Sequence, residues 1–215
     1  MTRILSDKNI FPLLILFILY WALLSGCATL GKNECLNADW FTIGYEDGAH
    51  GYPASRIGNH REACANHGVS PDFVRYEQGQ LAGLREYCTP QRGYGLGVVG
   101  KQYTYVCPDS LEPDFLEGYQ QGKNVYGAQM AVKRQKADLK KMQNDLAAVK
   151  QKLNGYETEL VGDDSIGHRR RRFLLEEIKI LTEEQRTIEA GILEQEALLE
   201  ISKMNLQKIR AQSSY

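Results

Sequence analysis

The chain has 215 residues, of which 43% are hydrophobic and 25% are charged, and its formal net charge at pH 7 is −1. A protein that binds nucleic acid needs a basic surface, so the near-neutral charge argues against that class. The sequence contains no serine elbow, no zinc-binding helix motif and no phosphate-binding loop, and it therefore gives no positive indication of an enzyme.

Residues 1–26 have the layout of a secretory signal peptide. The polar start carries Arg3 and Lys8, and an apolar run from Ile10 to Leu24 follows it. This run is shorter than the roughly 20 residues that a membrane-spanning helix needs. We therefore predict a cleaved signal peptide, with a retained membrane anchor as the alternative.

The stretch Leu24-Ser25-Gly26-Cys27 resembles the lipobox of bacterial lipoproteins. The resemblance implies that Cys27 becomes the first residue and carries a diacylglyceryl group and an N-acyl chain such as palmitate, which together anchor the protein stably. Ala28 rather than Asp follows, which by the same resemblance favours the outer over the inner membrane. We expect an envelope lipoprotein facing the periplasm, with residues 27–34 as its lipidated N-terminus and linker. The alternative is that Cys27 forms an ordinary disulfide.

The composition changes near Gly127. Residues 35–127 are rich in glycine and aromatic residues and hold four cysteines, whereas residues 128–215 contain neither cysteine nor proline. We predict a small globular domain over residues 35–127 and a separate helical segment over residues 128–215.

The four cysteines of the globular domain are Cys35, Cys64, Cys88 and Cys107. An even number in an oxidising compartment indicates disulfides, and three pairings are possible. An antiparallel pair of helices at 39–51 and 54–66 would favour Cys35–Cys64. A short β-hairpin within residues 93–106 would favour Cys88–Cys107.

A metal site that uses cysteines together with His50, His60 or His67 is the alternative for this domain. The sequence lacks a Cys-x-x-Cys spacing, so we expect neither a bound metal nor a cofactor apart from the lipid on Cys27.

The globular domain contains three similar tetrapeptides, Tyr45–Gly48, Tyr76–Gly79 and Tyr119–Gly122, and each overlaps a pair of glycines spaced four apart. The pairs are Gly44/Gly48, Gly79/Gly83 and Gly118/Gly122. Residues four apart share one face of a helix, and glycine there lets another backbone come close. We expect three closely packed helices. The alternative is a recognition face lined by Tyr45, Tyr76 and Tyr119.

Several segments of this half, taken in order, resemble one family of bacterial lipoproteins, domain-of-unknown-function family 2799. The segments are residues 34–40, 43–48, 61–64, 83–88, 106–108 and 115–119. The resemblance covers about residues 28–127 and implies an envelope lipoprotein domain without an assigned activity. It implies nothing about the second half.

Apolar residues in residues 128–215 recur at alternating steps of three and four, which is typical of a coiled coil. The phase breaks between Leu160 and Leu174, where residues 162–167 are rich in turn formers. We predict an antiparallel helical hairpin, with a continuous rod in a parallel dimer as the alternative. Three glutamines that interrupt the apolar pattern would fix the register at some cost in stability: Gln135, Gln185 and Gln195.

Four arginines follow the predicted turn: Arg169, Arg170, Arg171 and Arg172. They form either a solvated tip or a contact for anionic lipid head groups or cell-wall polymer.

The expected fold is mainly α, with a disulfide-stapled helical domain, a short β-hairpin and a long coiled-coil hairpin. We expect a membrane-anchored structural or adaptor protein that binds an envelope protein, or a second copy of itself, through residues 128–215. A ligand- or cell-wall-binding module that uses the tyrosines is the alternative. A hydrolase is a third hypothesis, based on Glu46, Asp47, His50, His60, Glu62 and His67, but we assign no catalytic residue.

Overall fold

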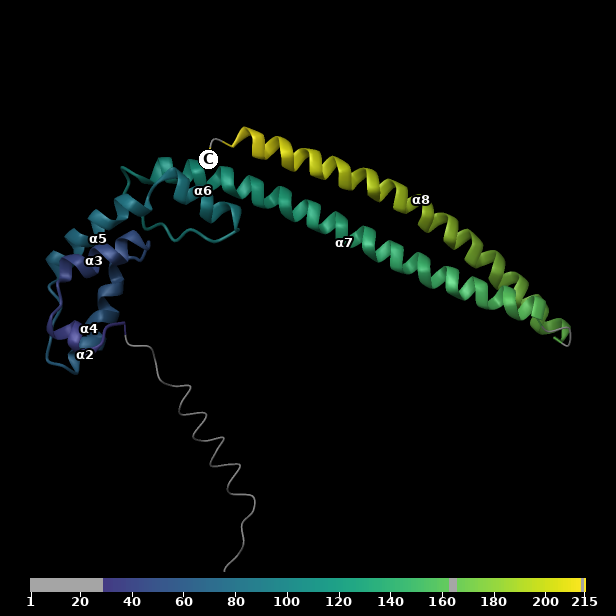
Figure 1. The fold of residues 1–215 in the computed structure, drawn as a ribbon, viewed down its shortest axis with the longest axis horizontal. Coiled ribbons are helices and arrows are strands. Elements are labelled where there is room, and N and C mark those ends of the chain that lie inside the picture. The colour runs from purple at the N-terminus through teal and green to yellow at the C-terminus, as the bar shows by residue number, and fades with distance from the viewer. Residues whose placement is uncertain (1–28, 163–165, 214) are drawn as a thin grey trace, which may run out of the picture. The chain divides into compact units, whose positions relative to one another are not determined.

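A computed structural model describes residues 29–162, 166–213 and 215. The predicted signal peptide, Cys27 and the centre of the predicted turn, residues 163–165, lie outside the described residues. The elements are α2 (Lys32–Leu36), α3 (Trp40–Ala49), the 3₁₀ helix η1 (Ala54–Arg56), α4 (Ile57–Ala65), α5 (Phe73–Tyr87), α6 (Pro90–Val98), α7 (Glu112–Gly162) and α8 (His168–Gln212) (Figure 1). The described part of the chain is mainly helical and contains no strand.

The chain divides into two compact units. Unit 1 comprises the chain up to Tyr87 together with Val106–Pro108, and unit 2 comprises Cys88–Tyr105 and Asp109–Tyr215. Helices α2 to α5 therefore belong to unit 1, and α6 to α8 belong to unit 2.

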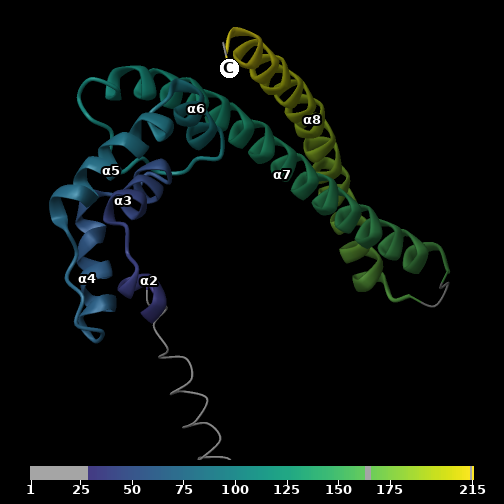
Figure 2. The same ribbon diagram turned by 60° about the vertical axis from the view of Figure 1, so that its left-hand side comes forward.

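Unit 1 is built on a close pair of helices, α3 and α5, which lie side by side in both views (Figures 1 and 2). Gly44 faces the carbonyl group of Tyr76, and one turn later Gly48 faces that of Gln80. Because both residue numbers rise together, the two helices run parallel. Four glycines form the contact, Gly44 and Gly48 of α3 and Gly79 and Gly83 of α5, and a Cβ on any of them would lie closer than 3.0 Å to the backbone of the other helix.

The disulfide between Cys35 and Cys64 joins α2 to α4, and its Cα atoms are 5.4 Å apart. Both cysteines are buried in the core of unit 1, with Trp40, Ile57 and Tyr76. The predicted pairing is thus confirmed, although the helix pairing behind it was wrong. Helix α3 packs on α5, and the segment predicted as one helix over residues 54–66 consists of η1 and α4.

The predicted β-hairpin over residues 93–106 is wrong, because Pro90–Val98 forms helix α6 of unit 2. The side chain of Thr89 caps this helix by accepting a hydrogen bond from the backbone N–H of Arg92, and Pro90 occupies its first turn, where proline is favoured. Gly93 and Gly97 face the backbone of α7 instead of forming turns. The chain from Lys101 to Val106 has no regular structure.

The remaining two cysteines, Cys88 and Cys107, are buried and disulfide-bonded. The N-terminal part of the chain therefore contains two disulfides, and all four of its cysteines are oxidised as predicted.

Helices α7 and α8 of unit 2 form an antiparallel hairpin, which we call the arm (Figure 2). Its pairing is shown by the ion pair between Lys150 and Glu189, with Nζ–Oε1 at 2.9 Å, and by that between Glu159 and Arg170 nearer the turn. The predicted hairpin is confirmed. Helix α7 continues through Gly127, where the composition changes, because this exposed glycine is followed by good helix formers and not by a capping signal.

Two of the three glutamines that were predicted to fix the register, Gln135 and Gln195, are in contact. The Gln195 side chain donates to the side-chain oxygen of Gln135 and to its carbonyl oxygen, the latter at 3.2 Å. Only one relative position of the two helices allows this contact, so the glutamine pair favours the observed register. No helix among the described residues has the length and apolar character that crossing a membrane requires.

Candidate functional site

A buried polar cluster in unit 1 is centred on the carboxylate of Asp47, which α3 carries beside Gly48. Tyr76 Oη and His60 Nε2 both donate to Asp47 Oδ2 at 2.7 Å, and Arg56 Nε donates to Oδ1 at 2.9 Å. The other ring nitrogen of His60, Nδ1, lies 2.9 Å from Thr29 Oγ1. We call these five residues the Asp47 network.

The hydrogen bonds and charges of the network compensate for the burial of the Asp47 carboxylate. Burial raises the pKa of the Asp47 carboxyl, but the hydrogen bonds from His60 and Tyr76 and the charge of Arg56 outweigh this effect and hold the pKa below its ordinary value. Burial and the hydrogen bond to Asp47 raise the pKa of the Tyr76 hydroxyl. The carboxylate is therefore ionised and the phenol neutral at physiological pH.

The order carboxylate, imidazole, hydroxyl in Asp47, His60 and Thr29 is the order found in hydrolytic triads. In such a triad the imidazole takes a proton from a nucleophile that reaches the substrate. Here His60 is only 3% exposed, and Arg56 and Tyr76 also donate to the carboxylate. This geometry is better suited to holding the elements of unit 1 together than to catalysis.

The structure does not bring the three predicted tyrosines to one exposed face. Tyr76 has no exposed surface and points into the core of unit 1, so its predicted role as a ligand contact is wrong. Tyr45 is partly exposed in unit 1. Tyr119, in unit 2, donates its hydroxyl proton to the carbonyl oxygen of Lys101 at 3.0 Å and accepts from the N–H of Tyr103. Tyr119 therefore positions the chain that follows α6.

The histidines that were considered as metal ligands or catalytic groups do not cluster. His50 Nδ1 bonds to the carbonyl oxygen of Glu46 in its own helix, and His60 belongs to the Asp47 network. Across the ranges that the structure describes, no group of three or more His, Cys, Asp or Glu side chains is arranged to hold a metal ion.

The outer surface of the arm is asymmetric. Helix α7 exposes one large hydrophobic residue, Val161 at its end, whereas α8 exposes several. Those of α8 are Phe173, Leu175, Ile180, Leu193, Leu198, Ile201 and Met204. Leu193, Ile201 and Met204 are more than half exposed, and with the exposed Ala197 they follow steps of four, four and three, which places them on one face. We call this face the α8 stripe.

The arginines at the start of α8 differ in their environment. Arg170 makes a bidentate pair with Glu159, at 2.7 and 2.6 Å, and its guanidinium lies over the ring of Phe173. Arg169, Arg171 and Arg172 are exposed and have no ion-pair partner among the residues outside the 163–165 gap. The structure therefore separates one arginine that ties the helices together from three that face solvent.

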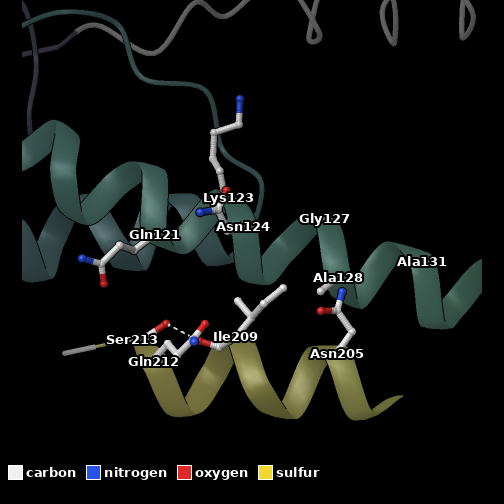
Figure 3. Close-up of a pocket in the computed structure, with 10 residues that line it drawn as sticks. All are labelled: Gln121, Lys123, Asn124, Gly127, Ala128, Ala131, Asn205, Ile209, Gln212 and Ser213. Carbon is white, nitrogen blue, oxygen red and sulfur yellow. Dashed lines mark hydrogen bonds between the residues drawn. The ribbon is translucent and has the colours of Figure 1, made fainter. Parts of the chain in front are cut away.

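A groove of ≈ 500 Å³ lies between α7 and α8 at the end of the arm opposite the turn (Figure 3). It exists because Gly127, Ala128 and Ala131 of α7 leave the seam unfilled. Figure 3 shows Asn205 and Ile209 of α8 directed toward these small residues. Its rim carries amide groups from both helices, which both donate and accept hydrogen bonds: Gln121, Asn124, Asn205 and Gln212.

The sequence reasoning did not find the Asp47 network or the α8 stripe. Asp47 carried a usable signal, since it shares a helix face with Gly44 and Gly48 and is therefore buried where that face meets another helix. The stripe was hidden because the apolar residues that form the seam dominate the periodicity of the arm.

A family model described as "Protein of unknown function (DUF2799)" matches residues 39–124. The match covers α3 to α6 and the first part of α7, and it confirms the resemblance that the sequence analysis identified. No curated protein and no solved structure gives a significant match.

Proposed function

Since residues 39–124 belong to the DUF2799 family, whose description assigns no activity, we propose a function from the geometry of the whole chain: a lipid-anchored adaptor of the bacterial envelope. Cys27 carries the lipid, the Gly-rich helices form a rigid base, and the arm presents a surface for a partner protein. The observation that carries this proposal is the α8 stripe.

The position of the stripe supports a binding role. A two-helix coiled coil needs only one apolar seam, and that seam is already present between α7 and α8, with Val149, Leu174, Leu181 and Leu199 buried in it. A second row of half-exposed apolar residues adds nothing to the hairpin itself. Apolar residues gathered on one face of a soluble helix are typical of contact surfaces, and an amphipathic helix of a partner fits such a face.

We expect the triple variant Leu193→Gln, Ile201→Gln, Met204→Gln to lose its partner while the arm remains helical. Each of these side chains contributes about 1–2 kcal/mol when it is buried in a contact, so crosslinking of the partner in intact cells should fall at least tenfold. The measurement is quantitative crosslinking followed by mass spectrometry, together with the helical circular dichroism of each variant.

The matched control is the variant Ala137→Gln, Ala147→Gln, which introduces glutamine at two exposed positions of α7. It should crosslink like the natural chain. Equal loss in both variants, or no specific crosslink in the natural chain, would contradict the adaptor proposal. Crosslinks to a second copy alone would identify the partner as the protein itself.

The free arginines favour a second candidate, contact of the arm tip with an anionic surface such as lipid head groups or cell-wall polymer. Near an anionic membrane each arginine contributes about 1 kcal/mol, so replacing Arg169, Arg171 and Arg172 with glutamine should weaken binding to anionic vesicles about 100-fold. Arg170 stays unchanged because it pairs with Glu159. The control is Arg134→Gln, an exposed arginine of α7. Binding that is unaffected by the triple change, or by added salt, would exclude this role.

A further inference from the structure

The parallel helix pair of unit 1 has a counterpart in unit 2. Helices α6 and α7 also pack through two glycine pairs, with Gly93 and Gly97 on α6 and Gly118 and Gly122 on α7, and each glycine faces the backbone of the other helix. Gly93 faces the carbonyl of Phe115 and Gly97 that of Tyr119, so this pair is parallel too.

The two helix pairs also agree in the residues that follow their first helices, α3 and α6. Gly51 follows α3 with φ 76° and Gly100 follows α6 with φ 70°. Each glycine lies against a tyrosine ring of the second helix, Tyr87 in unit 1 and Tyr126 in unit 2. Two copies of one structural design are therefore present in the chain.

Hydrogen bonds repeat in the same places. The N–H of Tyr52 donates to the carbonyl of Asp47 at 2.9 Å, and that of Lys101 donates to the carbonyl of Leu96 at 3.0 Å. In each unit a side chain of the second helix also donates a hydrogen bond to the chain that follows the first helix. The Gln80 side chain donates to the carbonyl oxygen of Tyr52 at 3.1 Å, and the Tyr119 hydroxyl donates to the carbonyl oxygen of Lys101.

The copies differ where the Asp47 network lies. Leu96 occupies the position of Asp47, and the fully buried Phe115 occupies that of Tyr76. The helix pair therefore forms without a buried carboxylate. Unit 1 alone has the longer connection, from His50 to Asp72, that supplies Arg56 and His60. The network therefore serves a feature that unit 1 has in addition, and its chain of hydrogen bonds ends at Thr29.

We propose that the Asp47 network is a latch that fixes Thr29 to unit 1 and so holds this unit directly against the lipid surface in which Cys27 is anchored. The proposal rests on the lipid anchor of the proposed function. An extended chain spans at most about 3.5 Å per residue. With the latch closed, the two steps from Cys27 to Thr29 allow a tether of about 7 Å. With it open and Leu30 detached from the core, the next fixed point is the disulfide at Cys35, and the tether reaches about 22 Å because Lys32 to Cys35 are helical.

Neighbouring contacts fit a surface that meets head groups. Leu30 packs against the core cluster and continues the attachment begun by Thr29. Arg56 lies 3.7 Å from the ring centroid of Tyr52, which is 41% exposed, beside Asp47. Aromatic and cationic side chains of this kind are enriched at the membrane–water interface.

The latch is tested first without lipid, on protein that begins with Cys27→Ser. Thr29→Val keeps the shape of the side chain and removes its hydrogen bond. Loss of one such bond should speed hydrogen exchange of the Cys35 amide, which donates to Gly31 O at 2.9 Å, about fivefold. The control Thr42→Val removes a hydroxyl bond to Asp39 elsewhere in unit 1 and should leave this exchange unchanged. Unchanged exchange in Thr29→Val overturns the latch.

A second variant makes the centre of the network apolar. It combines Asp47→Leu and Tyr76→Phe, after Leu96 and Phe115 of unit 2, with His60→Leu. It should keep its helicity and show the faster exchange. On anionic vesicles, lipidated protein with a fluorophore at Asn66 should transfer energy to head-group acceptors efficiently. The efficiency of energy transfer should fall in this variant toward the value of a control chain that carries eight flexible residues inserted before Thr29. Equal transfer in the natural chain and the variant overturns the role at the membrane. Absence of acyl mass on the natural chain would instead refute the proposed anchor and leave the exchange result standing.

Discussion

Replacing Gly79 with alanine is expected to destabilise unit 1 by about 3 kcal/mol, one of the largest effects of any single substitution in the chain. A Cβ at this position would lie against the carbonyl group of Phe41, closer than 3.0 Å. The obstacle is backbone, which cannot rotate away as a side chain can. Relief would require α3 and α5 to separate along their whole contact. Thermal unfolding followed by circular dichroism and by near-ultraviolet absorption of the buried aromatic residues measures the loss.

Two glycines provide matched controls because they are helical and have open space around them. A Cβ on Gly58 of α4 or on Gly155 of α7 meets nothing within 4 Å. Alanine there should leave stability unchanged or raise it by up to about 1 kcal/mol, since alanine is the better helix former. If Gly79→Ala unfolds at the temperature of Gly58→Ala, the close helix contact is refuted. Gly118→Ala, which faces the backbone of Pro90, should reproduce the loss in unit 2.

The glycine spacing also shows how far the sequence could predict the fold. Pairs at Gly44/Gly48 and Gly79/Gly83 predict helix faces that another backbone approaches, because this follows from helix geometry alone. The spacing does not say which helices meet or in which direction. That choice depends on the whole unit, in which the disulfide joins α4 to α2 and α3 packs on α5.

The segment from Pro90 to Val98 shows the opposite case, in which a local signal was misread. The alternating residues from Gln102 to Val106 suggested a short β-hairpin that reached back to Gly93. The helix start at Thr89 and Pro90 was the stronger signal, and Gly93 and Gly97 have the spacing already recognised elsewhere. The arm was predicted more reliably, because its apolar pattern repeats over many turns and the phase break before Leu174 favours a reversal of the chain.

The Asp47 network lay beyond sequence reasoning for a different reason. Its five members come from four elements and from the chain before α2, so that no spacing relates them. The sequence does indicate that the Asp47 carboxylate needs partners, because a carboxylate on the buried face of α3 must be paired. The comparison of the two units shows that this need arose in one copy only, where Leu96 and Phe115 are the apolar counterparts.

The second large effect concerns the disulfide between Cys35 and Cys64. These residues are 29 apart in the sequence, and closing a loop of this length in the unfolded chain corresponds to about 3–4 kcal/mol of stability in the chain-entropy account. The double variant Cys35→Ala, Cys64→Ala should therefore lose about that amount of unfolding free energy in urea. Both sulfurs are buried beside Trp40 and Tyr76, so the loss of packing adds to the effect.

A reduction experiment separates the covalent link from the packing. Dithiothreitol should destabilise the natural chain strongly, and it should destabilise the double variant less, because only the disulfide-bonded Cys88 and Cys107 remain to be reduced. The same chemistry tests the compartment. Protein taken from cells under thiol-trapping conditions should show no free sulfhydryl at Cys35 or Cys64, since the proposed envelope location is one where disulfides persist. Trapped thiols at both positions would place the chain in a reducing compartment, and the lipid anchor, the latch and the adaptor role would all have to be abandoned together.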